Sequence, residues 1–370
     1  MQISITGTGA VTCGFTSVDA LWNAALDGRS GIVDGMGHVS DSHSTRLALH
    51  SVNEAFNEAG WNGLNEDDGL ILATTTGQVP LWDKTLIQYL NGNASRETLN
   101  AALSHQPLGS LLQEICTALD FRGQTQLIST ACSASTQALA LGAMWIKQGR
   151  VKRCLVGGVE ILCDLTVQGF KSLQLLSTVP TKPFDTNRQG INLSEGSAFI
   201  CLENTNAHAL AQLSGYGLST DGYHMTSPHP QGDGCYRAMS LALKTAKLTP
   251  QDISWIHAHG TGSRHNDLAE GTAIQQLFGS DAAPWTTSTK WVHGHALGAS
   301  GAIETALCVR ALQNQTILAT GGLQSPDPAI ALKHPKQSFS HSIKHIMKNT
   351  LGFGGANAAI ILSAPSGATH

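Results

Sequence analysis

The sequence predicts an α/β protein built from two similar halves, and three observations support this prediction. Buried, β-rich runs alternate with helix-forming segments along the chain of 370 residues, which is typical of layered α/β folds. Segments of the first part recur in the same order in the second part. Only 13% of the residues are charged, about half of the roughly 25% in an average globular protein. We therefore expect a large buried core and further surface that is covered in an oligomer.

The internal repeat consists of three segments that each have a counterpart later in the chain. Any α/β chain contains some segments of similar pattern, so the repeat alone does not establish a duplication. If it is one, the halves are residues 1–204 and 205–370. The paired segments are 68–77 with 252–262, 126–132 with 285–298, and 195–203 with 355–362.

Composition excludes several classes of protein. With 41% apolar residues and few charges, the chain is neither disordered nor a coiled coil. A net charge of -4 disfavours a nucleic-acid binder with a basic face. No run of about 18 apolar residues indicates a membrane span, and the first residues resemble a strand rather than a signal peptide. Eight scattered cysteines without a CxxC pair favour a reduced, cytoplasmic enzyme.

Cys132 is the cysteine with the most distinctive setting. A β-rich run stops at Thr130, and a helix of small and apolar residues is expected to follow as far as Lys147, with Gly149 as its stop signal. Cys132 would then lie in a strand-to-helix turn near a helix N-terminus, where the thiolate is favoured. The alternative is a buried cysteine that only packs.

Two pairs of histidines, each separated by one residue and flanked by glycine, stand out among the sixteen. One interpretation is a metal site completed by a nearby histidine and aspartate, although no compact zinc-binding spacing is present. The other is that one histidine of each pair faces a shared pocket while its neighbour does not. The residues concerned are His257 and His259, His293 and His295, and, for the metal alternative, His265 and Asp267.

Lys290 and Glu304 lie on either side of the second histidine pair. They could form a buried ion pair that sets the geometry of the turn, or Lys290 could be an ordinary surface lysine.

Two glycine-rich segments invite different interpretations. Residues 349–357 place glycines around Phe353, so this loop could present a backbone N–H to an oxyanion, or be an ordinary turn. Residues 7–14 imitate a dinucleotide-binding fingerprint, but the third glycine is replaced by Thr12 and no acidic residue follows at a ribose position. We therefore reject nucleotide binding there.

Taken together and in order, these motifs resemble the β-ketoacyl-acyl-carrier-protein synthases, the elongating condensing enzymes of the thiolase-like superfamily. The resemblance covers nearly the whole chain. The segments that carry it are residues 5–12, 28–32, 130–134, 182–190, 194–196, 221–228, 258–263, 288–290, 294–304 and 352–357.

The resemblance implies a thiolase-like fold with five layers, αβαβα, and usually a dimer. It also implies that acyl carrier protein delivers the substrates on its phosphopantetheine arm, so no other cofactor and no metal is expected. By resemblance, Cys132 is the nucleophile, His259 and His295 are the catalytic histidines, and Lys290 and Glu304 support them. The N–H groups of Cys132 and Phe353 form the oxyanion hole, with Phe353 as acyl gate, and the substrate-binding positions are Thr261, Ser263 and Gly354.

The implied reaction is a decarboxylative Claisen condensation between malonyl-carrier and an acyl chain on Cys132, in fatty-acid, type II polyketide or aryl-polyene synthesis. Coenzyme A-primed relatives typically have asparagine in place of His295, and thiolases use a second cysteine. Two alternatives stay open: a structural or chain-length partner in a synthase heterodimer, and a cysteine acyl hydrolase. Cys132 disfavours the first, and the presence of Lys290, Glu304 and a second histidine disfavours the second.

The chain departs from the family in its basic residues. Between residues 31 and 49 only Arg46 remains of a basic run that often meets the acidic carrier. The carrier could instead dock on a partner subunit or on a second basic group, although for that group we favour the alternative of a solvated helix end: Lys147, Arg150, Lys152 and Arg153.

Overall fold

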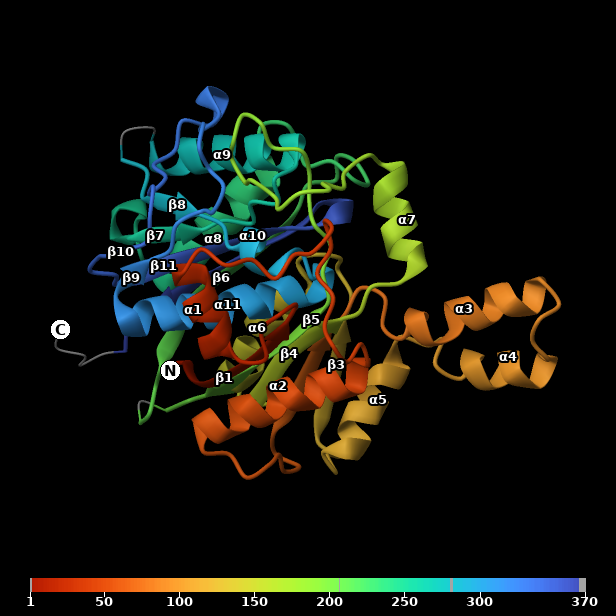
Figure 1. The fold of residues 1–370 in the computed structure, drawn as a ribbon. Helices are drawn as coiled ribbons and strands as arrows, with labels where there is room; N and C mark the ends of the chain where they lie inside the picture. Colours follow the sequence, from red (N-terminus) through yellow and green to blue (C-terminus); the bar gives the residue numbers. More distant parts are fainter. Residues whose placement is uncertain (1, 206, 280–281, 366–370) are drawn as a thin grey trace.

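The computed structural model describes residues 2–205, 207–279 and 282–365. Ten of its strands form one mixed sheet with the order β3-β2-β4-β5-β1-β6-β12-β11-β7-β8 (Figure 1). The strands are β1 (Ser4–Thr12), β2 (Gly69–Ala73), β3 (Gln124–Ile128), β4 (Arg153–Glu160), β5 (Gly196–Glu203), β6 (Ala211–Thr220), β7 (Trp255–His257), β8 (Trp285–Thr287), β11 (His345–Leu351) and β12 (Ala356–Ser363); β9 (Thr316–Ile317) and β10 (Phe339–Ser340) form a separate small sheet.

The strand order repeats in the two parts of the chain. From one edge of the sheet inward, the first five strands of the chain have the order β3-β2-β4-β5-β1. From the opposite edge inward, the later five have the equivalent order β8-β7-β11-β12-β6. The two series meet where Ser4 and Ile5 of β1 pair with Gln212 and Ala211 of β6. The predicted α/β fold class is thus confirmed, whereas the division after residue 204 stays a prediction.

Helices complete five layers around these strands. The helices α6 (Ala134–Lys147) and α11 (Ser300–Asn314) lie in the middle, and each contacts strands of both series. One outer layer packs on the first series and the other on the second, each through its own apolar cluster. The outer helices are α2 (Ser44–Ala59) and α5 (Gly109–Ala118) on one side, and α8 (Asp233–Ala246) and α9 (Arg264–Phe278) on the other; the shorter helices are α1 (Val18–Leu26), α7 (Asp164–Ser172) and α10 (Lys290–His293).

The glycines that imitate a nucleotide fingerprint have a packing role. A Cβ on Gly7 would lie 2.1 Å from the Ala55 carbonyl oxygen, and a Cβ on Gly9 would lie 2.0 Å from that of Ser51. Both contacts are with α2, so these glycines let this helix approach β1 closely. The expected helix after Cys132 is also confirmed: α6 ends at Lys147, and Gly149 adopts a φ of 68°.

A helical hairpin projects from the molecule beside β3, the outer strand of the first series (Figure 1). It consists of α3 (Val79–Leu90) and α4 (Arg96–Leu103). Several large apolar side chains of α3 are exposed, namely Leu81, Ile87, Tyr89 and Leu90. In the part of the chain that the structure describes, no helix is long and apolar enough to cross a bilayer.

Candidate active site

Cys132 lies in a tight turn between β3 and α6, as predicted. Ala131 just before it has a φ of 50°, in the left-handed region that residues with a side chain rarely occupy. The Ser133 hydroxyl donates to the Thr130 carbonyl oxygen at 2.9 Å and closes the turn. The sulfur is therefore held two residues before a helix, at the end where the dipole favours negative charge.

The environment of the Cys132 sulfur combines burial with converging donors. The residue is only 4% exposed. Burial raises the pKa of the thiol to about 11, and the Lys290 ammonium and the Phe353 backbone N–H act in the opposite direction. The backbone N–H of Cys132 itself acts in the same sense as that of Phe353. Two backbone N–H groups thus converge beside the sulfur, where they could hold the oxyanion that forms on a carbonyl oxygen once the sulfur attacks its carbon.

Two histidines face the sulfur. Nε2 of His295 lies 3.0 Å from Sγ of Cys132, and its Nδ1 lies 3.0 Å from the Ser300 hydroxyl. The His259 ring packs edge-on against His295, with ring centroids 5.3 Å apart. Burial, reinforced by the Lys290 ammonium, lowers the pKa of both histidines far below the usual value. Both rings are therefore neutral at physiological pH, and each keeps one N–H donor.

Two buried side chains, those of Lys290 and Glu270, orient His259. The Lys290 ammonium donates to the His259 carbonyl oxygen at 2.8 Å, and its Nζ lies 3.4 Å from Nδ1 of the same residue. The Glu270 carboxylate accepts the backbone N–H groups of His259 and Gly260 at 2.7 and 2.9 Å. Because the ammonium occupies Nδ1, the ring proton of His259 resides on Nε2.

Glu270 makes stability depend on pH. Burial raises its pKa from 4.5 to about 7, although two backbone N–H groups donate to it. Between pH 4.5 and about 7, the native state therefore holds one proton more than the unfolded state. The free energy of unfolding should fall as pH rises through this range and level off above about pH 7. Relative to Glu270→Gln, we expect the wild type to lose up to about 3 kcal/mol between pH 4.5 and 7.5, measured by urea denaturation. The substitution also alters the hydrogen bonds that His259 and Gly260 donate to this side chain. That cost does not depend on pH, so it cancels when the two pH values are compared. A wild-type-to-variant difference that is equal at both pH values would contradict the prediction.

Lys290 is buried in an ion-pair cluster, so the alternative of a surface lysine is wrong. It is 1% exposed and pairs with Glu304, which is fully buried. The second Glu304 oxygen lies 2.8 Å from Nζ of Lys348, a buried lysine on β11. Burial alone would raise the pKa of Glu304, but the two ammonium groups hold it well below its usual range.

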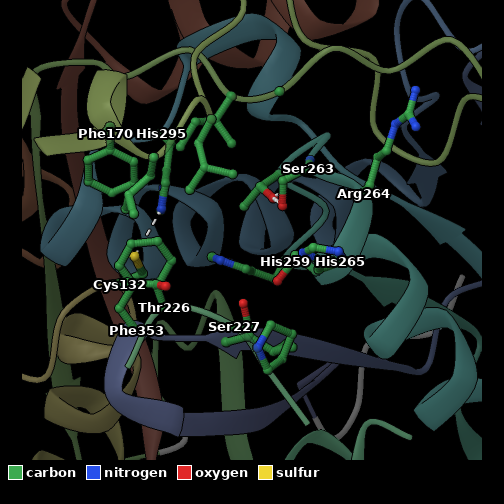
Figure 2. Close-up of a pocket in the computed structure, with 18 of the residues that line it drawn as sticks. Cys132, Phe170, Thr226, Ser227, His259, Ser263, Arg264, His265, His295 and Phe353 are labelled. Atoms are coloured by element: carbon green, nitrogen blue, oxygen red, sulfur yellow. Dashed lines mark hydrogen bonds between the residues drawn. The ribbon is translucent and has the colours of Figure 1, made fainter. Parts of the chain in front are cut away.

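A cavity of about 410 Å³ opens onto Cys132, His259 and His295. Figure 2 shows Phe170 and Phe353 beside the sulfur, whereas Ser263, Arg264 and His265 lie on the far side of His259. The Phe170 and Phe353 rings stack with centroids 5.3 Å apart. One end of the cavity is therefore apolar and the other polar. The apolar residues that line the cavity include Phe170, Leu173, Leu175, Ile191 and Phe353, and the polar residues at the end beyond His259 include Ser263, Arg264 and His265.

Two of the three predicted substrate-binding residues line the cavity, and the third does not. Thr261 and Ser263 line the cavity, and their hydroxyls lie 3.0 Å apart. Gly354 is exposed, does not line the cavity, and donates its N–H to the Met225 carbonyl oxygen at 2.7 Å. Its φ of 77° lets the loop turn so that the neighbouring Phe353 reaches the cavity.

The interpretation that one histidine of each pair faces a shared pocket while its neighbour does not is confirmed. His259 and His295 line the cavity, whereas His257 and His293 each lie 3.0 Å from the Thr289 hydroxyl outside it. Ligand atoms of Cys132, His259 and His295 lie within 4.8 Å of one another, a spacing that a metal ion could use. The neighbouring Lys290 ammonium, which occupies Nδ1 of His259, disfavours a cation there.

The second basic group lies away from the cavity. Its residues follow the C-terminal end of α6, about 20 Å from the end that follows Cys132. Each is already engaged: Lys147 and Arg150 lie over the Tyr216 and Trp145 rings, Lys152 pairs with Asp67, and Arg153 pairs with Asp68. The structure therefore favours the alternative of a solvated helix end for these residues.

The sequence analysis did not identify three residues that contact the site: Ser300, Glu270 and Lys348. Ser300 follows His295 by five residues, so a search for a hydroxyl near each histidine could have found it. Glu270 lies on α9, eleven residues after the His259 N–H that it accepts, and Lys348 reaches Glu304 from β11, so no short motif signals either contact.

Comparison with known proteins agrees with this geometry. Residues 38–208 match the model of the beta-ketoacyl synthase N-terminal domain, and residues 210–324 match that of the C-terminal domain. A Schizosaccharomyces pombe relative, whose name assigns it to 3-oxoacyl-[acyl-carrier-protein] synthesis in the mitochondrion, is 31% identical over 97% of this chain and 98% of its own.

Two solved structures share the fold over 98% of this chain and 99% of their own. The ishigamide ketosynthase/chain length factor is 28% identical with a TM-score of 0.91. A type II PKS acyl-carrier protein in complex with its ketosynthase bound to the hexaketide is 27% identical with a TM-score of 0.90. From its sequence, fold and matching family models, this chain belongs to the beta-ketoacyl synthase family of thiolase-like acyltransferases.

Proposed function

We propose that the protein catalyses decarboxylative Claisen condensation of malonyl-carrier with an acyl chain held on Cys132. The observation that carries this proposal is the meeting of three groups in one cavity. The Cys132 sulfur lies 3.0 Å from Nε2 of His295, His259 packs beside His295, and the N–H groups of Cys132 and Phe353 converge on the sulfur.

The first half-reaction loads the acyl chain. The Cys132 sulfur attacks the carbonyl carbon of an acyl-carrier thioester, and the resulting oxyanion accepts the N–H groups of Cys132 and Phe353. The C–S bond to the carrier then breaks, and the carrier sulfur leaves as a thiol with the proton that the Cys132 thiol gave up. The apolar end of the cavity, around Phe170 and Phe353, accommodates the acyl chain.

The second half-reaction extends the chain. Malonyl thioester loses carbon dioxide, and the electron pair of the broken C–C bond forms an enolate whose oxygen accepts N–H groups from His259 and His295. The enolate carbon attacks the acyl-Cys132 carbonyl, the oxyanion again occupies the backbone site, and its collapse releases the cysteine. The product is a β-ketoacyl-carrier two carbons longer. Neutral histidines suit this step because each donates a hydrogen bond without transferring a full proton.

The proposed partners are an acyl carrier protein and a second synthase subunit. Thr261 and Ser263 at the polar end of the cavity suit the amide-rich phosphopantetheine arm. The outer strand β3 and the exposed apolar side chains of α3 supply a surface for a homodimer or a synthase heterodimer. Related solved structures pair a ketosynthase with a carrier protein or with a chain length factor. We retain the predictions of a cytoplasmic location and of fatty-acid, polyketide or aryl-polyene synthesis.

Intact-protein mass spectrometry tests the proposal. The protein is incubated with acyl carriers of several chain lengths and then with malonyl carrier, beside a Cys132→Ala control. We expect the wild type alone to gain the acyl mass and then to lose it as a carrier product two carbons longer appears. Loss of the acyl group to water without malonyl carrier would indicate the hydrolase alternative. An absence of acylation in the isolated protein would refute an autonomous synthase and favour the heterodimer partner.

A further inference from the structure

Lys348 is a fully buried lysine that lies outside every motif of the family resemblance. It is on β11, five residues before Phe353. Removing an ammonium group from water costs several kcal/mol unless charged and polar partners compensate. The partners of Lys348 therefore indicate what its burial accomplishes.

The Lys348 ammonium contacts three groups. Its Nζ lies 2.8 Å from Oε2 of Glu304 and donates to the Thr136 hydroxyl at 3.1 Å and to the Thr350 hydroxyl. The two threonine hydroxyls also lie 2.8 Å from each other. These partners come from α11, α6 and β11, so one ammonium links three elements that are far apart in the sequence.

Each linked element carries a different part of the site. Thr136 is on α6, four residues after Cys132, and Thr350 is three residues before Phe353. Glu304 is the carboxylate that pairs with Lys290, which in turn contacts His259. We propose that Lys348 is a positioning residue of the active site, whose ammonium holds Glu304 against Lys290 and ties the Cys132 turn and the Phe353 loop to the same buried charge. The inference deepens the proposed function and rests on it for the role of Cys132.

The charge of the cluster gives this role a measurable consequence. Lys290 and Lys348 supply two ammonium groups against one Glu304 carboxylate, which leaves an excess of positive charge. Burial lowers the pKa of Lys348, while the adjacent Glu304 carboxylate opposes the change and favours the ammonium. The titratable groups that face Lys348 are Glu304 and Cys308 of α11, Lys290 and His293 of α10, His257 of β7, and His259 and His295 beyond them.

The thiolate of Cys132 should benefit from this excess positive charge. Its own charged neighbours are Lys290, which favours the thiolate, and Glu160 of β4, which opposes it. Replacing Lys348 by a neutral residue removes one of the two cations and leaves Lys290 and Glu304 balanced. The thiolate fraction at a given pH should then fall, and with it the rate of alkylation.

The test is the rate of Cys132 alkylation by iodoacetamide between pH 6 and 9 in the full-length protein. We expect Lys348→Met to react about threefold to tenfold more slowly than wild type at every pH. Lys348→Arg, which keeps the charge, should react within about twofold of wild type. Thr305→Val is the matched control, because Thr305 is a buried neighbour of Glu304 on α11 whose hydroxyl donates to the Gly301 carbonyl oxygen at 2.7 Å, so the substitution removes a hydrogen bond without changing the charge of the cluster and should keep the wild-type rate.

Two outcomes would overturn the inference. One is a folded Lys348→Met protein, judged by near-ultraviolet circular dichroism, that alkylates at the wild-type rate. The other is an equal slowing in Lys348→Met and Thr305→Val, which would reveal a packing role alone. If the methionine variant does not fold, Lys348→Gln takes its place with the same expectation. Alkylation requires neither carrier nor malonyl substrate, so failure of the condensation assay would leave this test intact.

Discussion

His259→Ala protein is expected to acquire an acyl chain on Cys132 nearly as fast as wild type, but to decarboxylate malonyl-carrier about 10²–10³-fold more slowly. The reason is that acylation uses the backbone donors of Cys132 and Phe353, whereas the enolate needs the side-chain donor of His259. Loss of one preorganised donor costs on the order of 3–4 kcal/mol in the transition state. Rapid-quench mass spectrometry for acylation and release of labelled carbon dioxide for decarboxylation separate the two steps.

His257→Gln provides the matched control for this experiment. His257 is a buried histidine two residues away on the same chain segment, but it contacts the Thr289 hydroxyl rather than the cavity. A glutamine amide can keep that contact, so both steps should stay within a few-fold of wild type. If His259→Ala slowed acylation and decarboxylation equally, the assignment of His259 to the enolate would fail.

Glu304→Gln is expected to lower the free energy of unfolding by about 3–5 kcal/mol. The substitution keeps the shape of the side chain but leaves the Lys290 and Lys348 ammonium groups facing each other without a carboxylate, and both lysines are at most 1% exposed. Such a loss is a large fraction of the roughly 5–15 kcal/mol by which proteins are stable. Urea denaturation followed by circular dichroism measures it.

Glu66→Gln serves as the control for charge removal, because Glu66 is exposed in the loop before β2. Its free energy of unfolding should stay within about 0.5 kcal/mol of wild type. Glu304→Asp keeps the charge on a shorter side chain and should lose less stability than Glu304→Gln. Equal stability of wild type and Glu304→Gln would mean that the buried cluster is not charged as inferred.

Much of the site could be predicted from sequence because its residues lie in short, ordered motifs. The run that ends at Thr130 and the small residues after Cys132 predict a strand-to-helix turn, and the structure places Cys132 in one. The pairing of the histidines was harder, since the residues alone allowed either a metal site or a shared pocket. Only the packing of β7 and α10 shows that His259 and His295 reach the cavity while His257 and His293 meet at Thr289.

Two features at the edge of the site depend on the fold. Gly354 stays a predicted substrate-binding residue, and only the fold shows that its N–H donates to the Met225 carbonyl oxygen. For the basic residues at the C-terminal end of α6, the sequence favours a solvated helix end over a carrier-docking site, and the direction of this helix, which places them opposite to Cys132, agrees with that preference. Both features depend on which backbone segments lie next to each other, and periodicity within one segment does not encode that.

The sequence by itself determined the fold class, the family and the identity of the chemical groups, because alternation of strands and helices and the spacing of glycines are local properties. The tertiary structure decided which charges share a low-dielectric interior. Lys290, Glu304 and Lys348 come from three separate elements, and nothing in their spacing predicts that two ammonium groups will meet one carboxylate. Their energies depend on distance and burial, which arise only when the central helices are enclosed between the two series of strands.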